Sequence, residues 1–512
     1  MNYQYSKKVL WLIVTVSVLK LVTASLIELG NDEVYYWTYA LQPDWNHFDH
    51  PPMVGWMIRV TTLNLNWVNE ISLRLGSIVC AAISTWFIFK TGKLLANEKT
   101  GWYAALIYNL SVYTGIIAGL FILPDSPQMP FWTGALYIMA HLFIKNDDQK
   151  TSIWLLLGLM IGIATLCKVH GLYLWAGFGL FIIITRIKWL LNWRLYAGVA
   201  VTLVCVLPIV YWNVINDFIT YRYHSERVTH TTIQWDMLGR EVGGEFAYQN
   251  PVIFILIVIS VIAILRRRIR FNRKKASVWL LCMSLPMILL FWGISLLNPT
   301  LPHWSGPAYI PLFFVGALYL EQRSHQLIPD FLKVAASLVI IVLITGVALI
   351  RLSPVNFGSH EKENYGEYCP TLDLSGWKNF SNDFAVKVKE EESRGLMKIH
   401  SPIIVNKWFP GGHLEFYTTR ATGLPVIAVG NLEDIHKFAW LNKERQLLQL
   451  GDDAWSVVPS NLPLNVQESY GTYFTTISNP DTIKQIRNGG VVRYFYVYRL
   501  KGCKLVAKPV LP

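Results

Sequence analysis

Residues 251–275 read PVIFILIVISVIAILRRRIRFNRKK. The segment 251–265 contains no charged side chain, whereas 266–275 consists mostly of arginine and lysine. An uncharged apolar run is typical of a helix in a lipid bilayer, and Lys and Arg gather in loops on the cytoplasmic side of a membrane. This stretch therefore predicts a membrane span and also the side on which the span ends.

The composition of the whole chain agrees with this reading. Hydrophobic residues make up 53% of the 512 residues and charged residues only 15%, against roughly 25% charged residues in an average globular protein. These values exclude a disordered chain, which needs low hydrophobicity and high charge. They also exclude an ordinary soluble enzyme, whose core could not hide so much apolar surface. Basic cytoplasmic loops account for the net charge of +12, so we expect no nucleic-acid partner.

Further apolar runs recur along the first 350 residues and predict about eleven transmembrane helices. The first run is long and no small-residue cleavage site follows it, so we expect a retained helix and not a signal peptide. The runs lie at 9–28, 72–90, 101–122, 127–144, 152–167, 171–186, 195–212, 251–265, 277–297, 307–320 and 331–350.

The loops between these runs predict the orientation of the chain. If the N-terminus with Lys7 and Lys8 is cytoplasmic, alternate loops should be basic, and they are, although the last is weak. An odd number of spans then places everything after about residue 351 outside the cytoplasm. The loops expected on the cytoplasmic side carry Lys90, Lys93 and Lys99; Lys145 and Lys150; Arg186, Lys188 and Arg194; the run 266–275; and Arg323.

Residues 351–512 differ in character, because the long apolar runs stop. Short strand-like stretches appear at Pro402–Val405 and Val491–Tyr498, a helical stretch at Leu432–Leu441, and dense turn signals between them. We therefore predict a mainly α, polytopic membrane domain at 1–350 and a small extracytoplasmic α/β domain at 351–512. Cys369 and Cys503 could pair if this domain faces an oxidising compartment, but no spacing motif supports a disulfide.

The polar residues of chemical interest fall in loops on one predicted face, the extracytoplasmic one. Each has an ordinary structural reading: solvated loop charges for Asp32 and Glu33, a helix cap for Asp125, and a lysine that reaches the headgroups for Lys168. Taken together these readings weaken, because ionisable groups at membrane depth are costly and usually functional. The candidates are Asp32, Glu33, Tyr35, Tyr36, His47, Asp49 and His50 after the first run, Asp125 after the third, Lys168 after the fifth, and His303 and Trp304 after the ninth.

This set of side chains suits one kind of chemistry. Carboxylates can deprotonate a hydroxyl or hold a metal ion, and lysine or histidine can bind a phosphate and stabilise it as it leaves. A site at the membrane boundary suits a phosphate linked to a lipid. The residues therefore indicate transfer of a sugar from a lipid-phosphate carrier to a hydroxyl.

Several motifs carry a family resemblance across roughly residues 25–320. They are Asn31-Asp32-Glu33-Val-Tyr35-Tyr36-Trp37, Phe48-Asp49-His50-Pro51-Pro52, Pro124-Asp125-Ser126-Pro127, Lys168 at the end of its run, and Pro302-His303-Trp304. With these motifs the chain resembles the membrane glycosyltransferases of fold type C. The branch it resembles is the bacterial one related to protein O-mannosyltransferases and to the lipid A aminoarabinose transferase.

The resemblance implies a polyprenyl-phosphate sugar donor, inversion at the anomeric carbon and an acceptor on the extracytoplasmic face. Asp32 would be the general base on the acceptor hydroxyl, with Glu33 beside it, and Asp125 would support the site. Asp49 matches a position that ligates a divalent metal in some members, so a metal cofactor is an open expectation.

The same resemblance assigns the binding residues. His50 stands where some members have lysine, and histidine is only partly protonated at neutral pH. Lys168 is therefore the expected phosphate cation, with His50 and His303 as further phosphate-binding residues. The neighbouring side chains Tyr35, Tyr36, His47 and Trp304 are expected to bind substrate.

Two other readings stay open from the sequence. A transporter or flippase of a lipid-linked sugar would usually show charges within helices and paired broken spans in two halves, which we do not see. A non-catalytic binding protein with a degenerate site is the other. The sequence names neither the sugar nor the acceptor, which could be a glycan, a lipid or a protein. The branch resembled points to the bacterial inner membrane.

Overall fold

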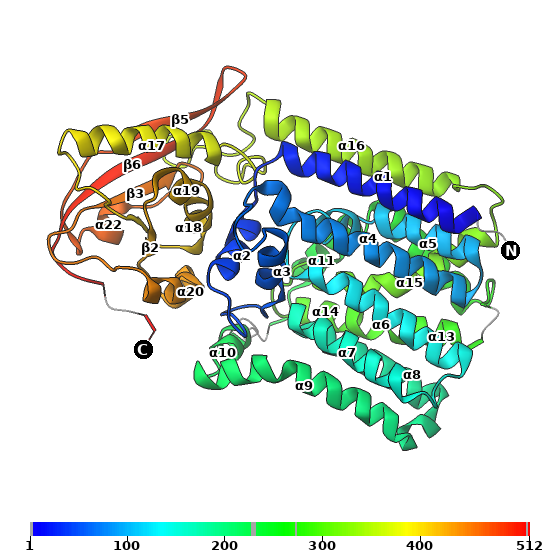
Figure 1. Cartoon of the computed structure of the whole chain (residues 1–512). Coiled ribbons are helices and arrows are strands. Elements are labelled where there is room, and N and C mark those ends of the chain that lie inside the picture. The colour runs from blue at the N-terminus through cyan, green and yellow to red at the C-terminus, as the bar shows by residue number, and fades with distance from the viewer. Residues whose placement is uncertain (1–3, 227–231, 272–273, 508–509, 512) are drawn as a thin grey trace. The chain divides into compact units, whose positions relative to one another are not determined.

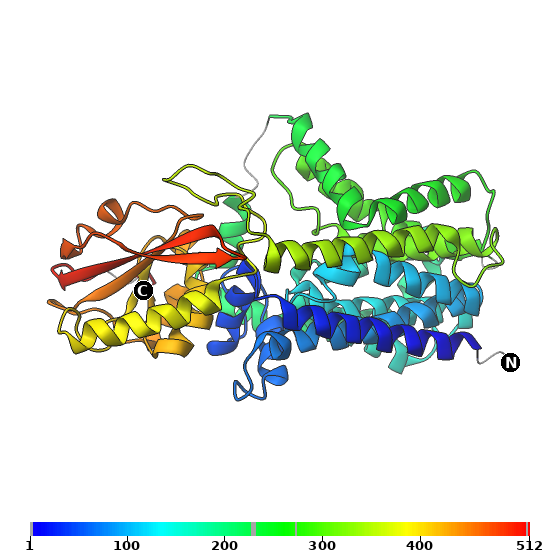
Figure 2. The same ribbon diagram turned by 90° about the horizontal axis from the view of Figure 1, so that it is seen from above.

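A computed structural model describes the whole chain except residues 1–3, 227–231, 272–273, 508–509 and 512. The chain divides into two compact units. The helical unit comprises Met1–Val22, Asp44–Thr61 and Ser72–Val342, and the α/β unit comprises Thr23–Pro43, Thr62–Ile71 and Leu343–Pro512. Figures 1 and 2 show the elements of both units from two directions.

Most residues of every apolar run expected to be a span lie in helices of the structure. Among the described residues, five helices are long and apolar enough to cross a membrane, namely Tyr5–Leu26, Glu70–Leu95, Trp193–Ile215, Lys275–Ser295 and Asp330–Leu352. A sixth is possible where Trp235–Tyr248 and Pro251–Leu265 join at a bend of 104°. The fold class, a polytopic helical protein with a C-terminal α/β part, is confirmed, and the number of eleven spans stays a prediction.

The bounds of these helices follow the chain. They are α1 (Gln4–Leu26), α3 (Met53–Thr61), α4 (Glu70–Leu95), α5 (Glu98–Leu110), the π-helix η1 (Tyr113–Ile117), α6 (Asp125–Lys145), α7 (Thr151–Cys167), η2 (Val169–Leu172), α8 (Tyr173–Thr185), η3 (Ile187–Leu191), α9 (Trp193–Ile215), α10 (Ile219–Glu226), α11 (Trp235–Tyr248), α12 (Pro251–Leu265), α13 (Lys274–Cys282), α14 (Leu285–Ser295), α15 (Gly306–Glu321) and α16 (Asp330–Leu352).

Glycines let several of these helices approach closely. A Cβ atom added to Gly158 of α7 would lie 2.0 Å from the carbonyl oxygen of Gly198 in α9, and one on Gly92 of α4 would lie 2.7 Å from Gly101 in α5. In a membrane the hydrophobic effect does not drive helices together, and small residues allow helix backbones to pack closely. The glycines therefore set the close packing of α7 on α9 and of α4 on α5.

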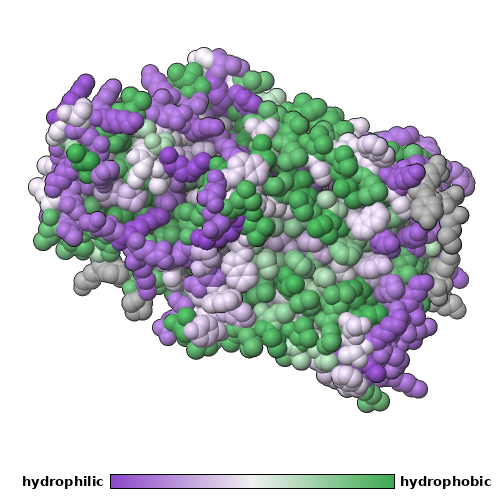
Figure 3. Space-filling model, in the orientation of Figure 1, coloured by the Kyte–Doolittle hydropathy of each residue, from purple (hydrophilic) through white to green (hydrophobic). Residues whose placement is uncertain are grey.

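Apolar side chains also cover the outside of the helices. Large residues such as Trp11 and Val18 of α1 and Ile341 and Ile344 of α16 are exposed, and Figure 3 shows hydrophobic residues gathered over these helices. An exposed apolar surface of this extent marks contact with lipid or another protein. Together with the length of the helices, it identifies the chain as a membrane protein.

The α/β unit is built on one mixed sheet in the order β2-β1-β3-β6-β4, with β5 also paired to β6. β1 pairs in parallel with β2 and β3, and β6 runs antiparallel to β3, β4 and β5. The strands are β1 (Ile403–Val405), β2 (Val426–Ala428), β3 (Ala454–Pro459), β4 (Phe474–Ile477), β5 (Asp481–Arg487) and β6 (Gly490–Cys503). The helices are α2 (Asn31–Leu41), α17 (Trp377–Ser393), α18 (Trp408–His413), η4 (Leu414–Thr418), α19 (Thr419–Thr422), α20 (Leu432–Ile435), α21 (Phe438–Leu441), η5 (Asn442–Glu444) and α22 (Val466–Tyr470).

Local sequence signals account for much of this unit. Asn488 and Gly489 take positive φ values of 43° and 83° between the paired residues Arg487 and Gly490, the Asn-Gly turn that matches the twist of a hairpin. The strands expected at Pro402–Val405 and Val491–Tyr498 are present as β1 and the middle of β6. The helix expected at 432–441 is broken at His436, whose φ is 48°.

The two cysteines of this unit do not form a disulfide. The Sγ atom of Cys369 lies 3.3 Å from the Thr371 hydroxyl, and that of Cys503 lies 3.5 Å from the Leu505 carbonyl oxygen. Each thiol is buried, in separate clusters of apolar side chains. The pairing considered from the sequence is therefore not present.

The division of the chain differs from the expected domains at 1–350 and 351–512. Residues 23–43, which include α2, belong to the α/β unit. They are held there by long-range hydrogen bonds: the backbone N–H of Leu29 donates to the Tyr417 hydroxyl at 2.8 Å, and that of Trp377 donates to the Glu28 carboxylate at 2.7 Å. Hydropathy could not reveal this, because the loop and its partners lie more than 300 residues apart.

Candidate functional site

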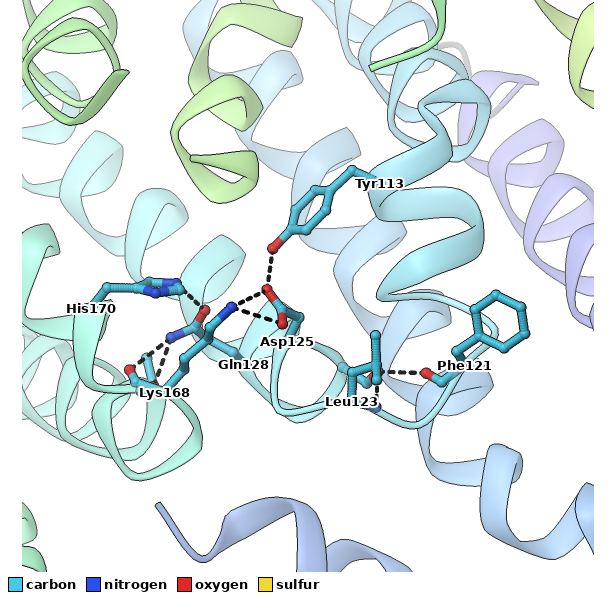
Figure 4. Close-up of polar contacts among 9 residues, drawn as sticks. Tyr113, Phe121, Leu123, Asp125, Gln128, Lys168 and His170 are labelled. Carbon is cyan, nitrogen blue, oxygen red and sulfur yellow. Dashed lines mark hydrogen bonds and ion pairs between the residues drawn. The ribbon is translucent and has the colours of Figure 1, made fainter. Parts of the chain in front are cut away.

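The helical unit holds a buried ion pair between Lys168 and Asp125. The Nζ atom of Lys168 lies 3.0 and 2.9 Å from the two carboxylate oxygens of Asp125, and both side chains are buried. Figure 4 shows the pair with the Tyr113 hydroxyl, which donates to Asp125 Oδ1 at 2.7 Å. Breaking a buried pair of this kind costs roughly 3–5 kcal/mol, because the remaining charge is left without compensation.

Both residues of the ion pair lie at the ends of helices. Asp125 begins α6, where a carboxylate is favoured by the helix dipole, and Lys168 caps the end of α7, where a cation is favoured. The Gln128 amide donates to the carbonyl oxygens of Ala164 and Lys168, both at 3.0 Å, and so ties the two ends together. His170 contacts the other atom of that amide, Gln128 Oε1, at 2.8 Å (Figure 4).

Tyr113 reaches Asp125 from the π-helix η1, a local widening of the helix that often occurs at functional sites. A Cβ on Gly306 would lie 2.5 Å from the Tyr113 ring. Only glycine therefore fits where α15 begins against that ring. The segment that carries His303 and Trp304 immediately precedes this contact.

Two carboxylates of α11 hold the segment 300–305, which carries His303 and Trp304, by hydrogen bonds. Glu245 is buried and accepts hydrogen bonds from the Tyr309 hydroxyl at 2.8 Å, from the Trp292 indole at 2.7 Å, and from the Ser305 hydroxyl. One turn earlier, Glu241 accepts from the Thr300 hydroxyl at 2.8 Å. The two glutamates fix residues 300–305, with His303 stacked on Tyr248 at a ring distance of 6.4 Å.

Two loop histidines share the electrostatic environment of the ion pair. Burial lowers the pKa of His50 to about 4, with Lys168 lowering it further and Asp49 and Asp125 opposing the shift. Burial likewise lowers the pKa of His303 to about 4, with the same opposing contributions from Lys168 and Asp125. Both rings are therefore neutral at pH 7, and Lys168 is the cation of this cluster.

Asp49 and His47 lie in the loop that leads into α3. The backbone oxygen of Asp49 accepts from His224 at 3.0 Å, and the His47 ring is buried. Phe48 packs on Tyr223 with ring centroids 4.5 Å apart, which anchors this loop to α10. Trp304 is half-buried against Phe291, at 6.1 Å between centroids.

Asp32 and Glu33 stand in the first turn of α2, in the α/β unit. Glu33 is buried and accepts from the Gly30 backbone N–H at 2.9 Å, so it caps its own helix, whereas Asp32 is exposed. Of the two acids, only Asp32 presents its side chain to solvent. Tyr35 and Tyr36 are buried in an aromatic cluster, with Tyr35 4.9 Å from the Trp408 ring.

Asn31 precedes Asp32, and both the nitrogen and the oxygen of its side-chain amide form hydrogen bonds. The Asn31 side chain donates to Asp373 at 3.0 Å and accepts from His413 Nε2 at 2.8 Å. The His413 ring stacks on Trp377 at 4.2 Å with an interplanar angle of 3°. This network fixes the start of α2 and with it the position of Asp32 in the unit.

The structure thus brings four of the predicted residues into one cluster in the helical unit: Asp125, Lys168, His50 and His303. Four others belong to the α/β unit: Asp32, Glu33, Tyr35 and Tyr36. Sequence reasoning missed Tyr113, Gln128, Glu241 and Glu245. For the last two a signal existed, since carboxylates four residues apart lie on one face of a helix. The roles of all these residues remain proposals.

Within the part of the chain that the structure describes, no group of three or more His, Cys, Asp or Glu side chains could hold a metal ion. A metal at Asp49 stays a prediction.

The chain is similar to one known protein family and to two individual proteins. The family described as dolichyl-phosphate-mannose-protein mannosyltransferase matches residues 49–212. Over 301 residues the chain is 26% identical to the lipid A galacturonosyltransferase RgtD of Rhizobium johnstonii, covering 57% of this chain and 60% of the relative. Over 128 residues it is 29% identical to the undecaprenyl phosphate-alpha-4-amino-4-deoxy-L-arabinose arabinosyl transferase of Yersinia enterocolitica, covering 24% and 22%. The chain thus matches less than two thirds of the length of either relative.

Among solved structures, the chain resembles ArnT from Cupriavidus metallidurans bound to undecaprenyl phosphate. The TM-score is 0.62 at 15% identity, over 96% of this chain and 97% of that one. At this identity the likeness establishes a shared fold. The expected resemblance to membrane glycosyltransferases of fold type C is confirmed.

Proposed function

We propose that this protein is an inverting glycosyltransferase that moves a sugar from a polyprenyl-phosphate donor to a hydroxyl group. The observation that carries the proposal is the buried Lys168, held by Asp125 within the region matched by the mannosyltransferase family. A buried lysine keeps its charge only beside an anion. Because Asp125 keeps Lys168 charged, the lysine can bind the phosphate of the donor without first taking up a proton.

The proposed reaction needs a base and a cation that binds the leaving phosphate. The acceptor oxygen forms a bond to the anomeric carbon as the bond from that carbon to the phosphate oxygen breaks. The acceptor proton passes to the Asp32 carboxylate, and the bonding electron pair leaves with the polyprenyl phosphate. Lys168 stabilises the charge that develops on this phosphate, while the neutral His50 and His303 rings donate hydrogen bonds.

Asp32 suits the role of base better than Glu33. Its carboxylate is exposed, whereas that of Glu33 is buried and accepts from the Gly30 backbone. A base must reach the proton that it removes. Glu33 in this proposal holds the first turn of α2, and Asp49 and Asp125 support the site.

The names of the relatives guide the choice of substrates. One acts on lipid A with galacturonic acid and the other uses undecaprenyl phosphate-linked aminoarabinose. We propose a lipid or glycan acceptor of the bacterial cell envelope, with a hexose or pentose as the transferred sugar. The enzyme would lie in the inner membrane, with the N-terminus cytoplasmic and the α/β unit outside.

The test uses purified full-length protein in detergent with undecaprenyl-phosphate donors that carry a labelled hexuronic acid or aminopentose. Acceptors are a cell-envelope lipid fraction and purified lipid A. We expect label to move to an acceptor with release of undecaprenyl phosphate, and Asp32→Asn to abolish this while keeping the thermal midpoint. Parallel reactions with EDTA test the metal.

A transporter is the alternative, but both relatives named above are transferases. Movement of intact donor across a proteoliposome membrane, without any label reaching an acceptor, would contradict the transferase. Turnover that survives Asp32→Asn would remove Asp32 as the base.

A further inference from the structure

A polar cavity lies in the α/β unit, away from the residues assigned above. It has a volume of about 470 Å³ and is lined by the last residues of α1 and α16, the start of α17 and the turn after β5. Its ionisable lining residues are Glu28, Glu70, Arg351, Lys378 and Arg487.

Each of the three cationic side chains that line this cavity has at least one N–H group without a hydrogen-bond partner among the described residues. Arg487 is buried; its two terminal nitrogens donate to the Leu349 carbonyl oxygen and the Thr371 hydroxyl, both at 3.0 Å, but its Nε has no partner. Arg351 and Lys378 are exposed, and their side chains make no hydrogen bond or ion pair with any described residue. A buried guanidinium N–H without a partner is costly and usually marks a missing acceptor.

The two carboxylates accept hydrogen bonds from groups other than these three cations. Glu28 accepts from the backbone N–H groups of Trp377 and Lys378 at 2.7 and 3.4 Å, and so covers the start of α17. Glu70 accepts from the Tyr417 hydroxyl at 3.3 Å. The cavity therefore combines an excess of positive charge with acids that already have internal donors.

The position of the cavity indicates which anion it binds. α1 and α16 are long and apolar enough to span a membrane, and few of their residues are buried inside the protein. Arg351 belongs to the last turn of α16 and Leu26 to that of α1. The cavity thus lies at the ends of two helices with few buried residues, where basic side chains can meet the phosphate of a lipid headgroup.

We propose that this cavity binds the phosphate of an anionic membrane lipid. The Arg351 and Lys378 side chains supply the donors beside the Arg487 guanidinium, and the exposed apolar side chains of α16 in the same unit, Ile344 and Leu352, contact the acyl chains. The inference does not rest on the glycosyltransferase reaction.

Native mass spectrometry of the full-length protein in detergent would measure the affinity, with phosphatidic acid as probe and phosphatidylcholine as the zwitterionic comparison. We expect preferential binding of phosphatidic acid and a roughly tenfold or greater loss of affinity in the double variant Arg351→Gln/Lys378→Gln. Arg487→Gln should lose affinity too. The control is Lys389→Gln, an exposed lysine further along α17, which should bind like wild type.

Three results would overturn the proposal. They are equal binding of the two lipids, an affinity of the double variant equal to that of the Lys389→Gln control, and full displacement of the lipid by inorganic phosphate at comparable concentration. The last would assign the cavity to a free anion. Because the Arg351 and Lys378 side chains are exposed, their loss should leave the thermal midpoint unchanged, so a failure to fold would not obscure the result.

Discussion

Lys168 is the residue on which the proposed chemistry depends most, and its pairing with Asp125 makes a simple substitution ambiguous. Lys168→Gln alone leaves the buried Asp125 carboxylate uncompensated and should destabilise the protein by roughly 3–5 kcal/mol. Adding Asp125→Asn removes that charge and should recover most of the thermal midpoint, but not the affinity for undecaprenyl phosphate. If the double variant bound the lipid phosphate like wild type, Lys168 would be a structural residue only.

His413 gives a second prediction for a single residue, in the dependence of stability on pH. Burial, with a smaller effect of Arg493, lowers the pKa of His413 well below its ordinary value. The unfolded chain then binds a proton that the folded chain does not, so stability falls as pH drops below about 6.5, by about 1.4 kcal/mol per pH unit for this group. Above that pH the effect is absent.

Thermal midpoints between pH 5 and 8 would check this sign. His413→Gln keeps a donor for Asn31 but cannot be protonated, so its midpoint should fall less steeply with acid than that of wild type. His400→Gln is the matched control, because the His400 side chain is exposed. Parallel curves for wild type and His413→Gln would contradict the assignment.

At the scale of elements, α11 carries the residues that hold the segment 300–305. Glu245→Gln replaces an acceptor of three donors by an amide that brings donors of its own. We expect a roughly 10- to 100-fold lower kcat, because small misplacements of catalytic groups have effects of this size, with a smaller change in KM for the donor. Asp236→Asn, an exposed acid on the same helix, should have no effect. A loss confined to KM would mean that Glu245 contacts substrate and does not position the segment.

Elements also show what the sequence could and could not predict. Apolar runs located the helices, and the Asn488-Gly489 pair located a hairpin, because both signals are local in the chain. The position of α2 in the α/β unit depends on contacts such as Leu29 with Tyr417, which no local pattern encodes. Asp125 and Lys168 could be assigned to one face from loop charges, but their direct contact depends on how α6 and α7 pack.

At the scale of the whole molecule, the orientation in the membrane is a prediction that labelling can test. The run 266–275 should be cytoplasmic and α17 extracytoplasmic. In intact bacteria with a permeable outer membrane, a membrane-impermeant maleimide should label Lys389→Cys and spare Arg268→Cys, both at exposed positions. The parent chain is the control for its six cysteines. The reverse pattern would place the α/β unit in the cytoplasm and contradict the proposed site of transfer.

The central claim is that donor binding and proton removal belong to different residues, Lys168 and Asp32. The most direct measurement compares equilibrium binding of undecaprenyl phosphate with single-turnover transfer in wild type, Asp32→Asn and Lys168→Gln/Asp125→Asn. We predict that Asp32→Asn binds the lipid phosphate like wild type and transfers no sugar, while the double variant loses binding. Transfer by Asp32→Asn at the rate of wild type would contradict the account.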